Sequence, residues 1–260
     1  MLDKVNAKES DMRCGAHQPL SDAVHRSWIK SNFSPTAVCS NCSGKHVGML
    51  GGAQALGASM NEYHLPSHAM QVLVRHVVAR LCELPEDSIQ WGIDGCNLPT
   101  PAFPLSRLAL IYAKLAHASD RSEPGNEVAG DEVNLAEIYQ AMTNYPELVA
   151  GDGRYCTILM RTFNGKVVGK LGADASYGVG VRASGHTHLT EDSDVIGIAV
   201  KVADGNVNVA YMLISEILER LQIGTPDQRA GLKTFHRPKI LNTKGVEVGS
   251  IEFPFWLTKH

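Results

Sequence analysis

The spacing of apolar side chains changes along the chain near residue 155. Before that point, residues 67–84 place apolar side chains three and four positions apart, which is the spacing of an amphipathic helix. The apolar positions are Met70, Val74, Val77, Val78 and Leu81, with Ser67 as the predicted N-cap. After residue 155, short apolar runs separated by turn residues predict β-strands. Helices followed by strands, rather than a regular alternation of the two, favour an α+β fold.

A turn signal and several apolar runs predict the remaining elements. The pair Asn164-Gly165 readily adopts the positive φ angles of a tight turn, so residues 155–163 and 166–171 are predicted to form a β-hairpin. Ser21 is the predicted N-cap of a short helix. Further strands are predicted at residues 179–182 and 195–202, further helices at 105–118, 135–145 and 209–221, and a loop at 119–133.

Charge and composition exclude several classes of protein. The 260 residues include 24 Lys plus Arg and 27 Asp plus Glu, a net charge of −3, which gives no basic surface for nucleic acid. No apolar run reaches the roughly 18 residues of a membrane helix, and the polar start lacks the apolar core of a secretory signal. Six cysteines in such a chain are expected to be reduced thiols, and the cytoplasm is the expected compartment.

Two cysteines at C-x-x-C spacing form the strongest local signal. Cys39 and Cys42 are followed within one helical turn by Lys45 and His46, a combination that can hold zinc or activate a thiolate. A zinc ion usually takes four ligands, and the best candidate for a further one is Cys96, in a proline-rich loop beside Asp94. Buried cysteines also serve simply as packing residues, so the spacing alone leaves both interpretations open.

Two lysines have alternative interpretations. Ser27 and Lys30 match the pattern S-x-x-K, a serine–lysine pair with nucleophilic chemistry, but a pattern with two free positions arises easily by chance. Lys170 lies within the apolar segment 167–172. Strand alternation favours a solvent-exposed side chain there, and the alternative is a desolvated lysine with a lowered pKa.

Four ungapped segments resemble the bacterial and fungal L-asparaginase II family of the Rhizobium type. They are VCSNCSGKHVGML (38–50), DGCNLPTPAFP (94–104), GDGRYC (151–156) and GKLGADASY (169–177), and the resemblance extends from about residue 13 to 255. It implies a β-lactamase- and glutaminase-like α+β fold with an antiparallel sheet flanked by helices. The expected organisation is a single domain over residues 1–260, mainly helical over about 16–150, with the sheet and a C-terminal helix over about 151–260.

The resemblance also implies an activity. Members of this family hydrolyse the side-chain amide of L-asparagine to L-aspartate and ammonia, an asparagine-catabolic reaction with a serine nucleophile, proton-shuttling lysines and an acyl-enzyme. The family further implies a homodimer and a zinc ion. Its catalytic lysine falls on Lys170, which reverses the interpretation from strand alternation. The family's substrate-binding positions fall on Asp94, His46 and Cys156, and its zinc ligands fall on Cys42, Lys45 and Cys96.

The chain departs from the family pattern at its beginning. The resemblance places the nucleophilic serine and its paired lysine in an N-terminal hairpin segment before Met1, so this segment is expected to be missing here. Ser27 and Lys30 do not replace that pair, because the family has the same stretch in addition to it. The alternatives are a catalytically inactive zinc-binding remnant or partner subunit, or an amide hydrolase or acyl transferase acting on another substrate in a biosynthetic pathway.

Overall fold

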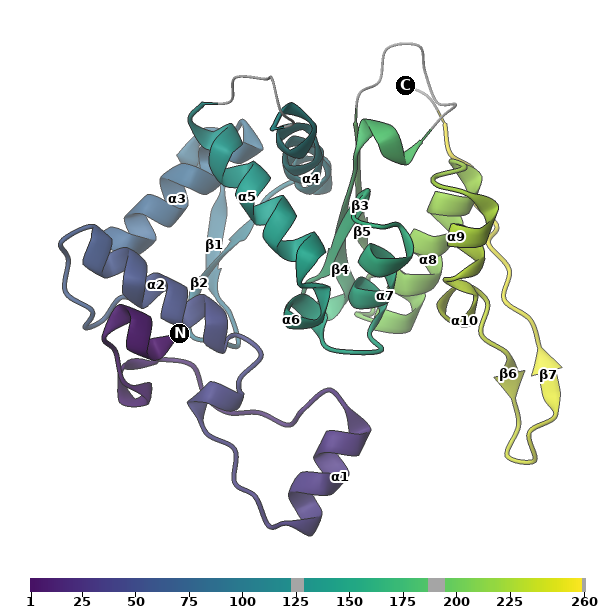
Figure 1. Ribbon diagram of the computed structural model, residues 1–260, viewed down its shortest axis with the longest axis horizontal. Helices are drawn as coiled ribbons and strands as arrows, with labels where there is room; N and C mark the ends of the chain where they lie inside the picture. The colour runs from purple at the N-terminus through teal and green to yellow at the C-terminus, as the bar shows by residue number, and fades with distance from the viewer. Residues whose placement is uncertain (123–128, 187–194, 259–260) are drawn as a thin grey trace. The chain divides into compact units, whose positions relative to one another are not determined.

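The computed structural model describes residues 1–122, 129–186 and 195–258 (Figure 1). The chain divides into two compact units, Met1–Phe103 and Pro104–His260, and each is described by itself. Residues 123–128 of the loop expected at 119–133 lie outside the described residues. Residues 119–121 and 131–133 are helical, so the expected loop was too long at both ends. The prediction of a single domain stays a prediction.

The first unit combines three α-helices with one antiparallel strand pair. Ser21 caps the first helix, as predicted, because its Oγ accepts a hydrogen bond from the Val24 N–H group. The third helix is capped by His68, whose side chain accepts from Met70 N–H, and not by Ser67. The elements are α1 (Asp22–Lys30), α2 (Ser43–Ala55), α3 (Ala69–Cys82), β1 (Gln90–Ile93) and β2 (Pro99–Ala102).

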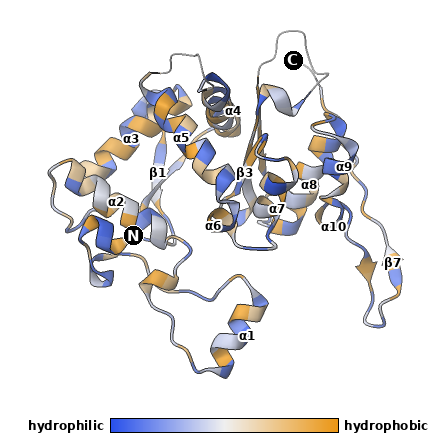
Figure 2. Ribbon diagram, in the orientation of Figure 1, coloured by the Kyte–Doolittle hydropathy of each residue, from blue (hydrophilic) through white to orange (hydrophobic). Residues whose placement is uncertain are grey.

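The core of the first unit draws on loops as well as helices. Leu50 of α2 packs with Tyr63, which lies between α2 and α3, and with Leu98, which precedes β2. All three side chains are fully or almost fully buried. Hydrophobic and hydrophilic residues alternate around α3 (Figure 2), as expected for a helix that covers a core with one face. The loops that carry Tyr63 and Leu98 are therefore fixed by core packing.

The second unit contains an antiparallel three-stranded sheet in the order β3-β4-β5, covered by helices. Its strands are β3 (Val167–Leu171), β4 (Ser176–Val181) and β5 (Ile196–Lys201), and a separate pair is formed by β6 (Ile240–Leu241) and β7 (Glu247–Gly249). Its helices are α4 (Leu105–Arg121), α5 (Asp131–Asn144), α6 (Pro146–Ala150), α7 (Tyr155–Thr162), α8 (Val207–Arg220), α9 (Pro226–Ala230) and α10 (Lys233–His236). Mixed helices and antiparallel sheets confirm the predicted α+β class.

Glycines allow α4 to approach the sheet closely. A Cβ atom at Gly178 would lie 2.0 Å from the Tyr112 ring, and one at Gly197 would lie 2.0 Å from the carbonyl oxygen of Ala109. Both are far below van der Waals contact, so any side chain at these positions would push α4 outward. The opposite face of β4 carries Tyr177, Val179 and Val181, which are fully buried. Alternation along β4 thus separates a face of glycines from a face of large side chains.

Helix α7 covers Tyr155–Thr162, so the prediction of a strand at residues 155–163 is wrong. The buried side chains of Tyr155, Cys156, Leu159 and Met160 recur at helical spacing, and a short apolar run of this kind is compatible with either structure. The predicted positive φ angles at Asn164-Gly165 are present, 52° and 71°, but they end a helix instead of joining two strands.

A buried carboxylate holds the C-terminal segment to the second unit. Glu216 of α8 accepts hydrogen bonds from Arg220, His236 and Arg237. Both arginines also hold the segment after β7. The Arg220 guanidinium donates to Phe253 O at 2.8 Å and lies over the Phe255 ring, and Arg237 donates to Ile251 O at 3.3 Å. The buried Glu216 carboxylate therefore connects α8, α10 and the segment after β7.

We expect Gly197→Ala to destabilise the second unit by about 1–3 kcal/mol, because the new methyl group overlaps backbone atoms that cannot rotate away. Gly92→Ala is the matched control, since a Cβ atom there meets nothing within 4 Å. Urea denaturation of both variants measures the difference. Equal stability of Gly197→Ala and the unaltered chain would show that α4 does not constrain β5.

Candidate functional site

A single carboxylate shapes the loop between β1 and β2. Asp94 Oδ1 accepts hydrogen bonds from the N–H groups of Cys96 at 2.8 Å and Leu98 at 2.9 Å. The backbone follows with a positive φ of 67° at Asn97, a conformation that asparagine tolerates well. The Asp94 side chain thus accepts the N–H groups of Cys96 and Leu98 within the loop. It therefore fixes where Cys96 lies relative to β1.

The second oxygen of Asp94 faces a lysine from the start of α2. Lys45 Nζ lies 3.1 Å from Asp94 Oδ2. Burial raises the pKa of Asp94, but the Leu98 N–H group, the Lys45 ammonium and the Cys96 N–H group together outweigh burial and hold that pKa below its ordinary value. Asp94 is therefore a partly exposed, ionised carboxylate at neutral pH.

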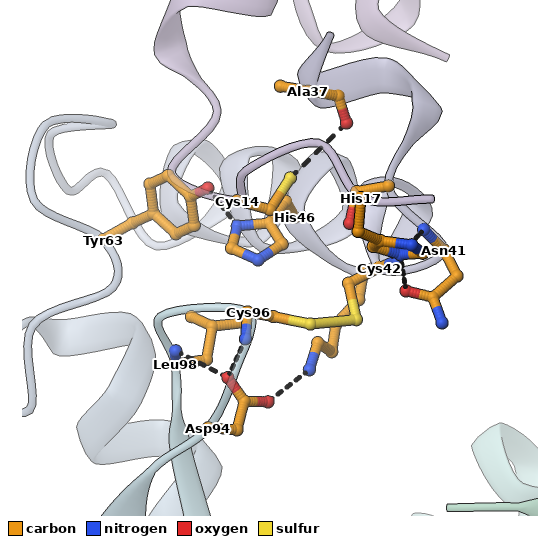
Figure 3. Close-up of a disulfide and its surroundings, with 12 residues drawn as sticks. Cys14, His17, Ala37, Asn41, Cys42, His46, Tyr63, Asp94, Cys96 and Leu98 are labelled. Atoms are coloured by element: carbon orange, nitrogen blue, oxygen red, sulfur yellow. Dashed lines mark hydrogen bonds and ion pairs between the residues drawn. A yellow bond between two sulfur atoms is a disulfide. The ribbon is translucent and has the colours of Figure 1, made fainter. Parts of the chain in front are cut away.

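Cys42 and Cys96 form a disulfide that spans 54 positions of sequence, with 6.5 Å between their Cα atoms (Figure 3). This corrects the prediction of six reduced thiols for these two residues. The N-terminal end of α2 and the Asp94 loop bring the two sulfurs together, and sequence spacing carries no information about such a contact. Cys39 has a free thiol, so the C-x-x-C pair does not act as a unit.

The disulfide bears directly on the expected zinc site. Two sulfurs within bonding distance can bind one metal ion after reduction, because zinc binds thiolates and not disulfides. Lys45 reaches the same loop through Asp94, and a lysine ligand would have to leave that partner and lose its proton. No group of three His, Cys, Asp or Glu side chains with metal-ligand geometry is present among the described residues. After reduction the two cysteines offer two thiolate ligands to one metal ion, and Lys45 is held at the same loop by its contact with Asp94.

His46 lies directly after Lys45 and is completely buried. Its Nδ1 atom is 2.5 Å from the hydroxyl oxygen of Tyr63, which also accepts the N–H group of Arg13 at 2.9 Å. Burial and the Lys45 charge lower the pKa of His46, while the backbone of Cys96 acts in the opposite direction. Figure 3 shows the His46 ring between Tyr63 and the Cys96 segment.

In the second unit, Cys156 and Lys170 each form a hydrogen bond with Leu171 at the end of β3. The buried Cys156 Sγ accepts hydrogen bonds from Leu171 N–H at 3.3 Å and the Tyr177 hydroxyl at 3.1 Å. Burial is the main reason that the pKa of Tyr177 lies well above its ordinary value, so this hydroxyl keeps its proton. The exposed Lys170 ammonium donates to Leu171 O. Strand alternation thus predicts the exposure of Lys170 correctly; its catalytic role stays a prediction.

Ser27 and Lys30 do not form a serine–lysine pair. Both side chains are exposed on α1, which buries none of its residues. The carbonyl of Ser27 accepts from the backbone and hydroxyl of Ser31, and no hydrogen bond joins Ser27 to Lys30 within the described residues. The arrangement agrees with the interpretation of this S-x-x-K pattern as a chance match.

Comparison with protein families decides the identity of the chain. The model of the L-asparaginase II family matches residues 1–253. The chain belongs to the L-asparaginase II family. A comparison with curated proteins finds no match. For this L-asparaginase II family chain, no helix of the described residues is long and apolar enough to cross a membrane.

Sequence reasoning missed two tyrosines in this L-asparaginase II family chain. Tyr63 bonds His46, 17 positions earlier, and Tyr177 bonds Cys156, 21 positions earlier. No motif connects either pair, because the contact forms only when separate elements pack. The one available signal for Tyr177 was its place in the segment 169–177, which also contains Lys170.

We expect Asp94→Ala to cost about 1–3 kcal/mol of stability, because it leaves the buried Leu98 N–H group without an acceptor. Asp94→Asn keeps a side-chain oxygen for that bond and should stay within about 0.5 kcal/mol of the unaltered chain. Chemical denaturation measures both, with the exposed Asp152→Ala as control. If Asp94→Asn lost as much unfolding free energy as Asp94→Ala, the stabilisation would come from the charge of Asp94 and not from its hydrogen bonds to the Cys96 and Leu98 N–H groups.

Proposed function

We propose that the chain is an asparaginase-type amidohydrolase that converts L-asparagine to L-aspartate and ammonia. Family membership supports the reaction class. The observation that carries the substrate assignment is Asp94, whose Oδ1 atom is held in place by two N–H groups and whose pKa lies below its ordinary value. A fixed, partly exposed carboxylate suits the α-ammonium group of an amino acid.

The proposed reaction proceeds through a serine acyl-enzyme. A neutral lysine takes the proton of the serine hydroxyl as Oγ bonds to the amide carbon, and the same proton is passed to the nitrogen as the carbon–nitrogen bond breaks and ammonia leaves. Water then attacks the ester, which gives the aspartate carboxylate and returns a proton to the serine oxygen. Lys170 is the proposed second proton-moving lysine, and His46 and Cys156 are the proposed substrate contacts, with Tyr177 bonded to Cys156.

Cys42, Lys45 and Cys96 are the proposed holders of a zinc ion once the disulfide is reduced. Bound there, zinc supplies positive charge that polarises a neighbouring oxygen. The lysine would bind as a neutral amine, so its release from Asp94 frees that carboxylate for a cationic group. We also propose that the protein is a homodimer and that it is located in the cytoplasm. Light scattering during size-exclusion chromatography measures the molar mass and so tests the homodimer.

Ammonia release from L-asparagine tests the proposed reaction. We expect release from the protein that carries the proposed serine and its lysine. In that protein Asp94→Asn should raise the KM about tenfold, because the ammonium group loses its charged partner. Asp152→Asn, at an exposed position of the second unit, is the control. Release from another amide but not from asparagine would favour the biosynthetic alternative. No release from any amide would favour the inactive subunit.

Zinc content tests the metal proposal independently of turnover. The reduced protein should bind about one zinc ion per chain, and Cys42→Ser and Cys96→Ser should each abolish most of that binding. Cys39→Ser is the matched control, because Cys39 has a free thiol next to the site. Elemental analysis after dialysis gives the ratio. Unchanged zinc content in Cys42→Ser, or its loss in Cys39→Ser, would refute the ligand assignment.

A further inference from the structure

Arg154 carries a half-buried guanidinium group that pairs with no carboxylate among the residues that the structure describes. The guanidinium donates one hydrogen bond, from Nη2 to the Tyr211 hydroxyl at 3.3 Å. A guanidinium has five N–H donors, and a partly desolvated charge is costly without an opposite charge. Other arginines of the second unit have such partners: Arg161 with Glu147 and Asp152, Arg182 with Asp120, Arg229 with Glu219, and Arg220 and Arg237 with Glu216.

The turn before α7 fixes the backbone of Arg154. Gly151 and Gly153 have φ angles of 93° and 72°, a region that favours glycine. The Gly151 carbonyl accepts the Arg154 N–H group at 3.4 Å and the Thr157 hydroxyl at 2.6 Å. The first turn of α7 therefore holds the turn in place, and Arg154 leaves the backbone from a fixed position.

Tyr211 of α8 fixes the other end of the Arg154 side chain. Its ring stacks on the Tyr155 ring, with 4.6 Å between the centroids, and lies edge-on to the Phe235 ring at 6.0 Å. Tyr155 is completely buried, and Tyr211 is almost so. Because these rings restrict each other, the hydroxyl that accepts the Arg154 hydrogen bond has little freedom to move.

The Tyr211 hydroxyl also relates Arg154 to the proposed substrate contact Cys156. Burial is the main cause of the raised pKa of Tyr211, the Arg154 charge acts against it, and Cys156 adds to it. Both groups therefore lie near this hydroxyl. Tyr177, whose hydroxyl bonds the Cys156 sulfur at 3.1 Å, packs edge-on against the Tyr211 ring with 6.2 Å between centroids. The same aromatic cluster thus places the guanidinium and the sulfur in one region of the second unit.

The proposed reaction needs a permanent cation in addition to its lysines. L-Asparagine and L-aspartate both carry an α-carboxylate beside the ammonium group proposed for Asp94. Lys170 is proposed to move protons, and a lysine in that role loses its charge during the reaction. A guanidinium group stays charged in proteins, and its planar fork matches the two oxygens of a carboxylate.

We propose that Arg154, held by Tyr211, binds the α-carboxylate of the amino-acid substrate and product. The proposal rests on the proposed function for the identity of the ligand. Its physical content is a carboxylate on the Arg154 guanidinium, which can be measured as binding without turnover and without zinc. Missing ammonia release would leave Arg154-dependent binding of L-aspartate intact. Binding that does not depend on Arg154 would leave the reaction class intact.

Two ligands that differ only in the α-carboxylate test the proposal. L-Aspartate carries this group, and β-alanine has the same ammonium group and the other carboxylate but lacks it. Isothermal titration calorimetry on the full chain gives both Kd values. We expect the unaltered protein to bind L-aspartate at least about tenfold more tightly than β-alanine, because a charge-assisted pair of hydrogen bonds is lost.

Substitution of Arg154 should remove this preference. Arg154→Gln is expected to bind L-aspartate about tenfold more weakly and β-alanine with unchanged affinity. Arg154→Lys keeps the charge without the fork, so its affinity for L-aspartate should lie between the two. Arg161→Gln is the matched control, because Arg161 lies on the same helix and pairs with Glu147 and Asp152; it should bind both ligands as the unaltered protein does.

The outcomes that overturn the proposal differ in what they exclude. Equal affinities of the unaltered protein for the two ligands, or no binding of L-aspartate, overturn the carboxylate site even if Arg154→Gln does not fold. Circular dichroism shows which variants are folded. A folded Arg154→Gln with unchanged affinity for L-aspartate, or with an equal loss for both ligands, overturns the assignment to Arg154.

Discussion

The carboxylate of Asp94 has two oxygens with separate structural tasks, and the site of the first unit depends on this division. Oδ1 accepts two backbone N–H groups and so closes the loop between β1 and β2. Oδ2 is left to pair with Lys45 at the beginning of α2. Because the loop is closed, Cys96 comes to lie against Cys42, and its backbone lies beside His46. One side chain thereby sets the geometry of a charged group, a pair of sulfurs and a buried imidazole.

The second unit depends on a different constraint, the close packing of α4 on the sheet. Gly178 and Gly197 leave no room for a side chain between helix and strands. The large residues of β4 consequently lie on the opposite face, where Tyr177 reaches Cys156 of α7. The Cys156 sulfur accepts bonds from both Tyr177 and the backbone of Leu171, and the adjacent Lys170 is left at the exposed edge. The packing of α4 on the glycine face of the sheet thus leaves Tyr177 on the opposite face, where its hydroxyl reaches Cys156 near the end of β3.

The sequence predicted elements well where local physics decides them. Ser21 caps a helix, Asn164 and Gly165 adopt positive φ angles, and three of the predicted strands are present as β3, β4 and β5. The prediction of a strand at residues 155–163 failed, because a short, largely apolar segment fits a strand or a buried helix equally well until its packing partners are known. The prediction of reduced thiols also failed for Cys42 and Cys96, whose contact depends on the loop that Asp94 closes.

The sequence by itself determined the α+β class, the family segments and the chemical types of the candidate site residues, since periodicity, turn residues and motif composition are local properties. The tertiary structure alone decided which of these residues meet: Cys42 with Cys96, Lys45 with Asp94, and His46 with Tyr63. The physical reason is that each contact joins segments 17 to 54 positions apart, through loops whose path is fixed by core packing and by buried hydrogen bonds.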